Sequence, residues 1–129
     1  MVKRGVTGLG KAEKDMHRKQ LEQAFCLKLS GELAIFRYEI LKKEKEAIYE
    51  AAYQIDSIIS IYELLAEMSG RLSTETLEAA VMIPDILTFL YREWLKYEDS
   101  YTADIRYCLD KELAKLRRDY RAMKEENIV

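Results

Sequence analysis

Apolar residues recur every three or four positions through most of this 129-residue chain, and a single proline interrupts the pattern. That spacing lines one face of an α-helix, whereas a half-buried β-strand would alternate at every second residue. Only five glycines accompany the proline, so the chain has little material for a turn-rich β fold. The sequence therefore predicts an all-α protein.

The first predicted helix begins at Lys11. Its apolar stripe consists of Leu21, Phe25, Leu29, Leu33, Phe36 and Ile40. A charged run at residues 42–46 predicts a turn before a second helix, which has two neighbouring apolar rows. One row contains Ile48, Ala52, Ile55, Ile59 and Tyr62, and the other contains Ala51, Ile58, Ile61 and Leu65. So broad a surface predicts a central helix contacted on two sides. Gly70 is expected just past the end of this helix, with a left-handed backbone conformation.

Two shorter elements are expected on either side of the proline. Ser73 or Thr74 is placed to cap a third helix, whose first turn contains Glu75 and Glu78. Pro84 ends that helix and is predicted at the first position of a fourth. The apolar face of the fourth helix contains Leu87, Leu90, Tyr91, Trp94 and Leu95. Of these, Trp94 is expected to be the main core anchor.

The last predicted helix has the longest apolar stripe and is capped by Asp99, Ser100 or Thr102. The stripe consists of Tyr101, Ile105, Cys108, Leu109, Leu113, Leu116, Tyr120 and Met123. Short connections and the absence of a repeat predict a compact bundle of about five amphipathic helices. Residues 1–10 are expected to form a flexible tail, and residues 11–129 a single helical domain.

The residues that usually carry catalysis or bind metals are few and isolated. His17 is the only histidine and lies in a charged stretch, which favours a solvated surface position. Glu63 and Glu67 share a helix face, but exposed acidic pairs of this kind are common. Cys26 and Cys108 fall on or beside apolar stripes, where cysteines usually pack as small hydrophobes. We therefore expect a protein that is not an enzyme and holds no cofactor or metal.

The same composition predicts a soluble cytoplasmic protein. There is no CxxC spacing, no apolar run suited to a signal peptide, and no stretch of roughly 20 apolar residues. The formal net charge is −2, but its distribution is uneven. Residues 1–28 have seven basic and three acidic residues, whereas residues 44–104 have four basic and thirteen acidic ones. An acidic body between basic ends disfavours a general nucleic-acid binder.

Surface recognition is the remaining kind of function, and the acidic centre supplies its candidate residues. The candidate partner-binding surface consists of Glu63, Glu67, Glu75, Glu78, Glu93, Tyr97, Glu98, Asp99 and Asp104. Pairs of tyrosines also share helix faces, namely Tyr49 with Tyr53 and Tyr97 with Tyr101. On the last helix, basic rows made of Arg117, Arg121, Lys124, Lys111, Lys115 and Arg118 alternate with Glu112, Asp119, Glu125 and Glu126. That alternation is typical of a solvated, salt-bridged face.

Residues 90–109, LYREWLKYEDSYTADIRYCL, carry a resemblance to a known family. The segment resembles a bacterial domain-of-unknown-function family of small helical proteins from gut Gram-positive bacteria and their mobile elements. Weaker similarity extends over roughly residues 20–115. This chain has Ile83 before the proline, where the family usually has Asn or Asp. The resemblance implies a setting in a mobile element or prophage, and it implies no activity.

Three hypotheses of function follow. The leading one is a non-enzymatic interaction protein of a mobile element, such as an anti-CRISPR inhibitor whose acidic helical surface occupies the nucleic-acid channel of a host nuclease. The alternative is a small nucleic-acid-binding regulator that uses the basic N-terminal tail and the last helix. The third is a homodimer in which a second chain completes the broad face of the second helix.

Overall fold

The structure is a computed structural model and describes residues 10–97 and 104–128. Every regular element in this part of the chain is helical, so the predicted all-α fold is confirmed. The elements are α2 (Lys11–Leu41), α3 (Lys45–Glu50), α4 (Ala52–Met68), the 3₁₀ turn η1 (Ser69–Arg71), α5 (Thr74–Val81), α6 (Ile86–Leu95) and α7 (Ile105–Ile128). Residues 1–9 of the predicted tail lie outside the described residues.

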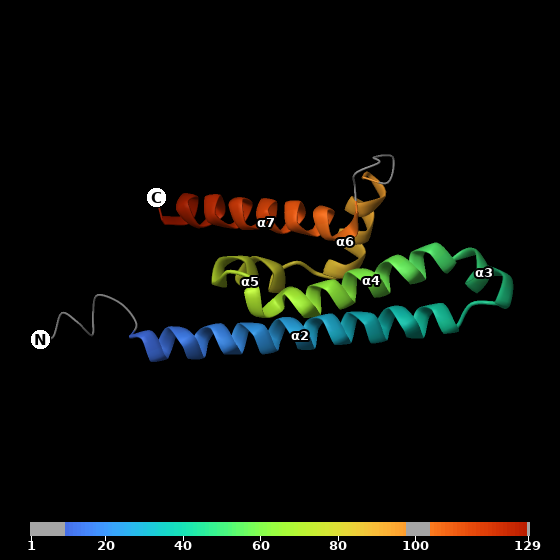
Figure 1. Ribbon diagram of the computed structural model, residues 1–129, viewed down its shortest axis with the longest axis horizontal. Coiled ribbons are helices and arrows are strands. Elements are labelled where there is room, and N and C mark those ends of the chain that lie inside the picture. Colours follow the sequence, from blue (N-terminus) through green and yellow to red (C-terminus); the bar gives the residue numbers. More distant parts are fainter. Residues whose placement is uncertain (1–9, 98–103, 129) are drawn as a thin grey trace, which may run out of the picture.

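The helices form a bundle with its two longest members on opposite sides (Figure 1). Helix α2 runs along one edge of the molecule, and α7 runs in the opposite direction along the other. Helices α4, α5 and α6 occupy the space between them, and α5 packs closely against both α2 and α7. All the other elements therefore lie on one side of α2.

The hydrophobic core draws side chains from every long helix. Its buried members are Phe25, Leu29, Ile58, Ile61, Leu65, Met68, Leu77, Ala80, Ile86, Leu87, Leu90, Leu109 and Leu113. Burial of each large apolar side chain contributes about 1.5–3 kcal/mol to the free energy of unfolding. These residues come largely from the stripes that the sequence predicts.

The second predicted helix is divided in the structure. Ala51 adopts φ −87° and ψ 7°, which separates α3 from α4. Helix α4 is central and contacts α2, α6 and α7, as predicted. Its two apolar rows differ, however: Ile58, Ile61 and Leu65 are fully buried, whereas Ile59 in the other row is 40% exposed. One side of α4 is therefore covered much less completely than the other.

Two predicted helix boundaries are wrong. Gly70 does not adopt a positive φ, because α4 continues directly into the η1 turn and needs no left-handed residue there. Pro84 does not occupy the first position of α6, which begins two residues later, at Ile86. Asp85 intervenes as the N-cap residue with φ 49°, the only positive φ among the described residues other than glycine.

The start of α6 is capped from another helix. The backbone N–H of Leu87 donates a hydrogen bond of 2.9 Å to Oε1 of Glu32 on α2. The other carboxylate oxygen of Glu32 lies 2.8 Å from Nζ of Lys28. A carboxylate is favourable at a helix N-terminus because free N–H groups and the positive end of the dipole lie there. Asp85 makes no side-chain cap hydrogen bond of its own, so Glu32 takes over this role.

The predicted N-cap of α5 is confirmed, but the prediction that Trp94 is the main core anchor is wrong. The Ser73 hydroxyl accepts a hydrogen bond from the backbone N–H of Thr76, as expected for an N-cap. Trp94 is only half-buried, and its indole Nε1 donates to the hydroxyl of Tyr53 over 2.9 Å. Leu90, one turn earlier, is fully buried and anchors α6 instead.

Candidate interaction surfaces

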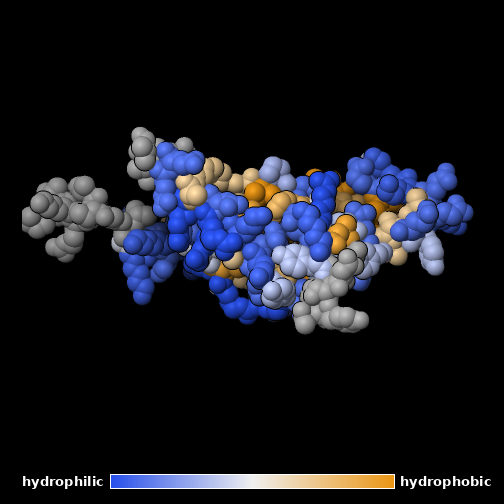
Figure 2. All heavy atoms as spheres, turned by 90° about the horizontal axis from the view of Figure 1, so that it is seen from above, coloured by the Kyte–Doolittle hydropathy of each residue, from blue (hydrophilic) through white to orange (hydrophobic). Residues whose placement is uncertain are grey.

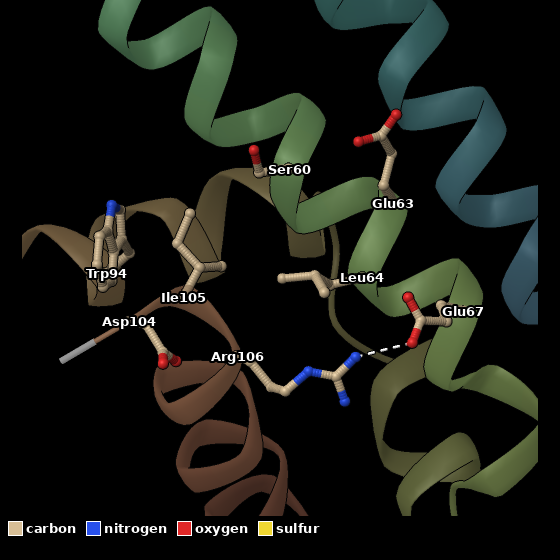
Figure 3. Close-up of a pocket in the computed structure, with 8 residues that line it drawn as sticks. All are labelled: Ser60, Glu63, Leu64, Glu67, Trp94, Asp104, Ile105 and Arg106. Atoms are coloured by element: carbon tan, nitrogen blue, oxygen red, sulfur yellow. Dashed lines mark hydrogen bonds and ion pairs between the residues drawn. The ribbon is translucent and has the colours of Figure 1, made fainter. Parts of the chain in front are cut away.

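Three of the predicted acidic residues gather around one groove between α4, α6 and α7 (Figure 3). We call it the Trp94 groove, and its volume is about 680 Å³. The groove is lined by Ser60, Glu63, Leu64, Glu67, Trp94, Asp104, Ile105 and Arg106. Its walls therefore combine carboxylates with an aromatic ring and a guanidinium group.

Glu67 joins two helices across the Trp94 groove. Nη2 of Arg106 on α7 lies 2.8 Å from Oε1 of Glu67 on α4, as the dashed line in Figure 3 marks. Arg71 approaches the same oxygen at 3.5 Å. The hydrogen bond and charge of Arg106, followed by those of Arg71, lower the pKa of Glu67 below its ordinary value. The charge of Glu67 is thus largely compensated within the molecule.

The other two carboxylates of the Trp94 groove differ from Glu67. Oδ1 of Asp104 accepts a hydrogen bond of 2.7 Å from the backbone N–H of Tyr107, so Asp104 caps the first turn of α7. The predicted caps Asp99, Ser100 and Thr102 lie outside the described residues. Glu63 is exposed and makes no ion pair within residues 10–97 and 104–128. Asp104 therefore supplies negative charge beside Trp94, whereas the Glu63 carboxylate points toward α2 (Figure 3).

Glu75 and Glu78 lie at the other end of the bundle, on α5. Glu75 pairs with the guanidinium group of Arg121, which lowers the pKa of this carboxyl. Glu78 lies 3.2 Å from Nε2 of His17 and accepts a hydrogen bond of 3.3 Å from the Tyr120 hydroxyl. His17 is exposed at the surface, as the sequence suggests, and there it contacts Glu78 of α5. These contacts bind α5 to both α2 and α7.

The remaining described candidates lie at the end of α6. Glu93 pairs with Lys96 at 3.0 Å. The Tyr97 hydroxyl donates a hydrogen bond of 3.0 Å to Glu112, which raises the pKa of Tyr97 to about 12. Glu112 is only 7% exposed, so its predicted place on a solvated face is wrong. Glu98 and Asp99 lie outside the described residues.

The seven described candidates therefore form separate groups. Arg106 and Arg121, which bond to the groups on α4 and α5, are fifteen residues apart on α7, about 22 Å at 1.5 Å per residue. Glu67, Glu75, Glu78 and Glu93 all have partners within the molecule. Of the seven described candidates, Glu63 and Asp104 are the acidic residues without an ion pair among the described residues, and both line the Trp94 groove.

The face of the molecule that carries α7 is mostly hydrophilic (Figure 2). Arg121, from one predicted basic row, is held by Glu75, and Arg106 is held by Glu67. Lys111 and Lys124 lie over the rings of Tyr107 and Tyr120, at 5.4 and 5.2 Å from the ring centroids. The two salt bridges described here for α7 join it to α4 and α5, and neither uses the acidic residues that alternate with the basic rows.

A second groove lies between α2, α3 and α4, and we call it the apolar groove. Its volume is about 410 Å³. It is lined by Leu33, Phe36, Arg37, Ile40, Leu41, Ile48, Ile55, Ile59, Tyr62 and Glu63. The exposed tyrosines Tyr49 and Tyr53 belong to the same α3–α4 region. The less buried row of α4 supplies part of this lining, which explains why that row is apolar without being in the core.

The cysteines behave as the sequence suggests. Cys108 is fully buried, and burial raises the pKa of its thiol to about 11. Cys26 is half-buried, and its thiol lies 3.8 Å from the Ser69 hydroxyl. A thiol with a raised pKa has little thiolate at neutral pH and is a poor nucleophile. Cys108 therefore serves packing.

Within the described ranges, no group of three or more His, Cys, Asp or Glu side chains is arranged to hold a metal ion. None of the helices there combines the length and hydrophobicity that crossing a membrane requires. Comparison of the chain with known protein families, curated proteins and solved structures gives no match. The family resemblance of residues 90–109 stays a prediction.

Proposed function

We propose that this chain is a non-enzymatic protein that binds another protein through the apolar groove. The observation that carries the proposal is an almost wholly apolar lining left open to solvent. Leu41 is 64% exposed and Ile59 is 40% exposed, and neither is covered by another element in the described part of the chain. Contiguous exposed apolar surface of this kind is typical of interaction sites.

The shape of the apolar groove favours a helical segment of the partner. The groove runs between α2 and α4, and an amphipathic helix binds such a site by inserting apolar side chains from one face. Its volume of about 410 Å³ accommodates only a few side chains. Arg37 and Glu63 line the groove with opposite charges, so they favour a partner helix with complementary charges beside its apolar face.

A photo-crosslinking residue at position 59 identifies the partner, and binding of the purified proteins tests the proposal. The control carries the same group at Ala114, which is exposed on α7. Ile59→Glu places a charge in the groove, and we expect it to weaken binding at least tenfold while helicity is unchanged. Equal affinity of the partner for Ile59→Glu and the unaltered chain would contradict the proposal.

A second candidate function uses the Trp94 groove. Asp104 provides negative charge beside the aromatic side chain of Trp94 there, which supports an inhibitor that occupies the basic channel of a nuclease. Binding of this kind weakens with salt, and Asp104→Asn should weaken it further while retaining the helix cap. A nuclease that binds the variant and the unaltered chain equally well would argue against this function. The mobile-element setting rests on the family resemblance alone.

A further inference from the structure

Helix α3 places one side chain at the wall of the apolar groove. Ile48 lines the groove together with Ile40 and Leu41 from the end of α2 and Ile55 from the first turn of α4. Figure 1 shows α3 at the corner where the chain turns from α2 into α4. One end of the apolar groove therefore already holds an apolar side chain that a helix presents to it.

The rest of α3 has few contacts with the molecule. All six residues of this helix are described; none is buried, and only Ala47 and Ile48 are half-buried. The four others are exposed, with Tyr49 at 83%. The lysine and the two glutamates of α3 form no ion pair with any described residue. Ile48, as the larger of the two half-buried side chains, therefore provides most of the apolar contact of α3.

The break between α3 and α4 has no local cause in the sequence. It falls at Ala51, between Glu50 and Ala52, although alanine and glutamate are among the stronger helix formers. Residues 45–68 contain neither glycine nor proline. Local preference alone would continue these residues as one helix, so the rest of the structure imposes the bend.

A modest backbone rotation separates the bent arrangement from a continuous helix. Ala51 has φ −87° and ψ 7°, whereas a regular α-helix has values of about −63° and −42°. The main difference is thus a rotation of about 50° in one ψ angle. On the other side of α3, the connection through residues 42–44 lets Leu41 and Lys45 separate by up to about 13 Å. Neither neighbouring helix therefore fixes α3 rigidly.

Movement of α3 exchanges one apolar contact for a more regular helix. Ile48 loses the groove wall, whereas the helical hydrogen bonds of α4 gain a continuous extension across Ala51. An apolar side chain of a partner helix that takes the place of Ile48 covers Ile40 and Ile55 again. A partner that binds this end of the groove therefore favours the arrangement in which α3 has moved away.

We propose that α3 is a releasable internal occupant of the apolar groove, and that the groove is fully open to a partner only when Ile48 has left it. The contact is autoinhibitory, because Ile48 and an apolar side chain of the partner compete for the same wall. The affinity for the partner is reduced by the fraction of molecules in which α3 is in place. The identity of the competitor as a partner helix rests on the proposed function.

The distance between two spin labels measures the movement of α3. One label is attached through Glu46→Cys on α3 and the other through Leu27→Cys on α2, and both positions are exposed. Cys26 is replaced by alanine in this chain, while Cys108 is fully buried and stays unlabelled. A shift of α3 away from the groove changes the distribution of distances between the two labels.

Ile48→Ala removes most of the side chain that holds α3 in the groove. We expect the population with a displaced α3 to grow about fivefold, as loss of a half-buried side chain predicts. The matched control is Tyr49→Ala, which shortens an exposed side chain of the same helix and should leave the distribution unchanged. Both variants should remain folded, because neither residue belongs to the buried core. A distribution that Ile48→Ala leaves unchanged would overturn the proposal.

Binding of an apolar dye tests whether α3 obstructs the groove. The probe is anilinonaphthalenesulfonate, and we expect Ile48→Ala to bind it about threefold more tightly than Tyr49→Ala does. Equal affinities would overturn the autoinhibitory role of α3. Both experiments use the chain without a partner. They can therefore succeed when Ile59→Glu leaves partner binding unaltered, and in that case the proposed function fails while the release of α3 stands.

Discussion

The two sides of α4 are equally apolar in sequence but differ in what covers them. The row containing Ile58, Ile61 and Leu65 is completely enclosed by the bundle, whereas Ile59 in the other row faces the apolar groove. The first row is apolar because burying its side chains removes them from water and stabilises the fold. The second row gains less stability from being apolar, because part of it stays in contact with solvent. The comparison thus separates apolar residues that hold the fold from those available for binding.

The largest expected effect is a loss of stability, and it tests whether the enclosed row of α4 holds the fold while the groove row does not. Leu65→Ala removes a fully buried side chain and leaves a cavity, so we expect the free energy of unfolding to fall by about 2–5 kcal/mol. Ile59→Ala should lower it by less than about 1 kcal/mol, because that side chain already contacts water. Urea denaturation measures both. Similar losses for the two variants would show that the groove side of α4 contributes to the core as much as the enclosed side does.

A smaller loss of stability is expected when the start of α6, which packs against α4, loses its cap. Glu32→Ala removes the acceptor for the Leu87 N–H, and loss of a helix cap costs about 1–2 kcal/mol. The matched control is Glu39→Ala, which removes an exposed pair with Lys42 and should cost less than about 0.5 kcal/mol. Urea denaturation of the two variants compares them. Equal costs would mean that the Glu32 cap does not stabilise α6.

The smallest effect concerns two charged contacts, that of Glu67 with Arg106 at the Trp94 groove and that of Glu75 with Arg121 at the other end of the bundle. The pKa of Glu67 and that of Glu75 are lowered in the folded protein, so both groups bind fewer protons than in the unfolded chain. Their contribution to stability is present above the ordinary glutamate pKa of 4.5 and is lost as the pH falls through the lowered values. Urea denaturation at neutral pH and below pH 4.5 should show this loss. Glu67→Gln should make the dependence shallower, and an unchanged pH dependence would contradict the role of Arg106.

The helices could be predicted because their signals are local. The spacing of apolar residues along α2, α4 and α7, and the cap at Ser73, depend only on neighbours in sequence. The pairing of side chains could not be predicted in the same way. Arg106 and Glu67 are 39 residues apart, and Glu32 and Leu87 are 55 apart, so only the packing of the helices brings them together.

The binding surfaces illustrate the same limit. The acidic residues are visible in the sequence, but which of them have a partner depends on Arg106, Arg121 and His17, which come from other helices. Glu112 has the sequence context of a surface residue and is buried because Tyr97 lies over α7.

The cap that Glu32 provides for α6 has a consequence for the order in which the protein folds. Helix α6 is ten residues long, and isolated helices of that length are only marginally stable in water. Its first turn gains a carboxylate acceptor only after a loop of 55 residues has closed and α2 has docked. During synthesis, α2 emerges first, but the contact that fixes α6 forms only once Leu87 has left the ribosome. The first turn of α6 therefore gains its cap late in folding. Formation of this short helix depends on α2, the longest helix described.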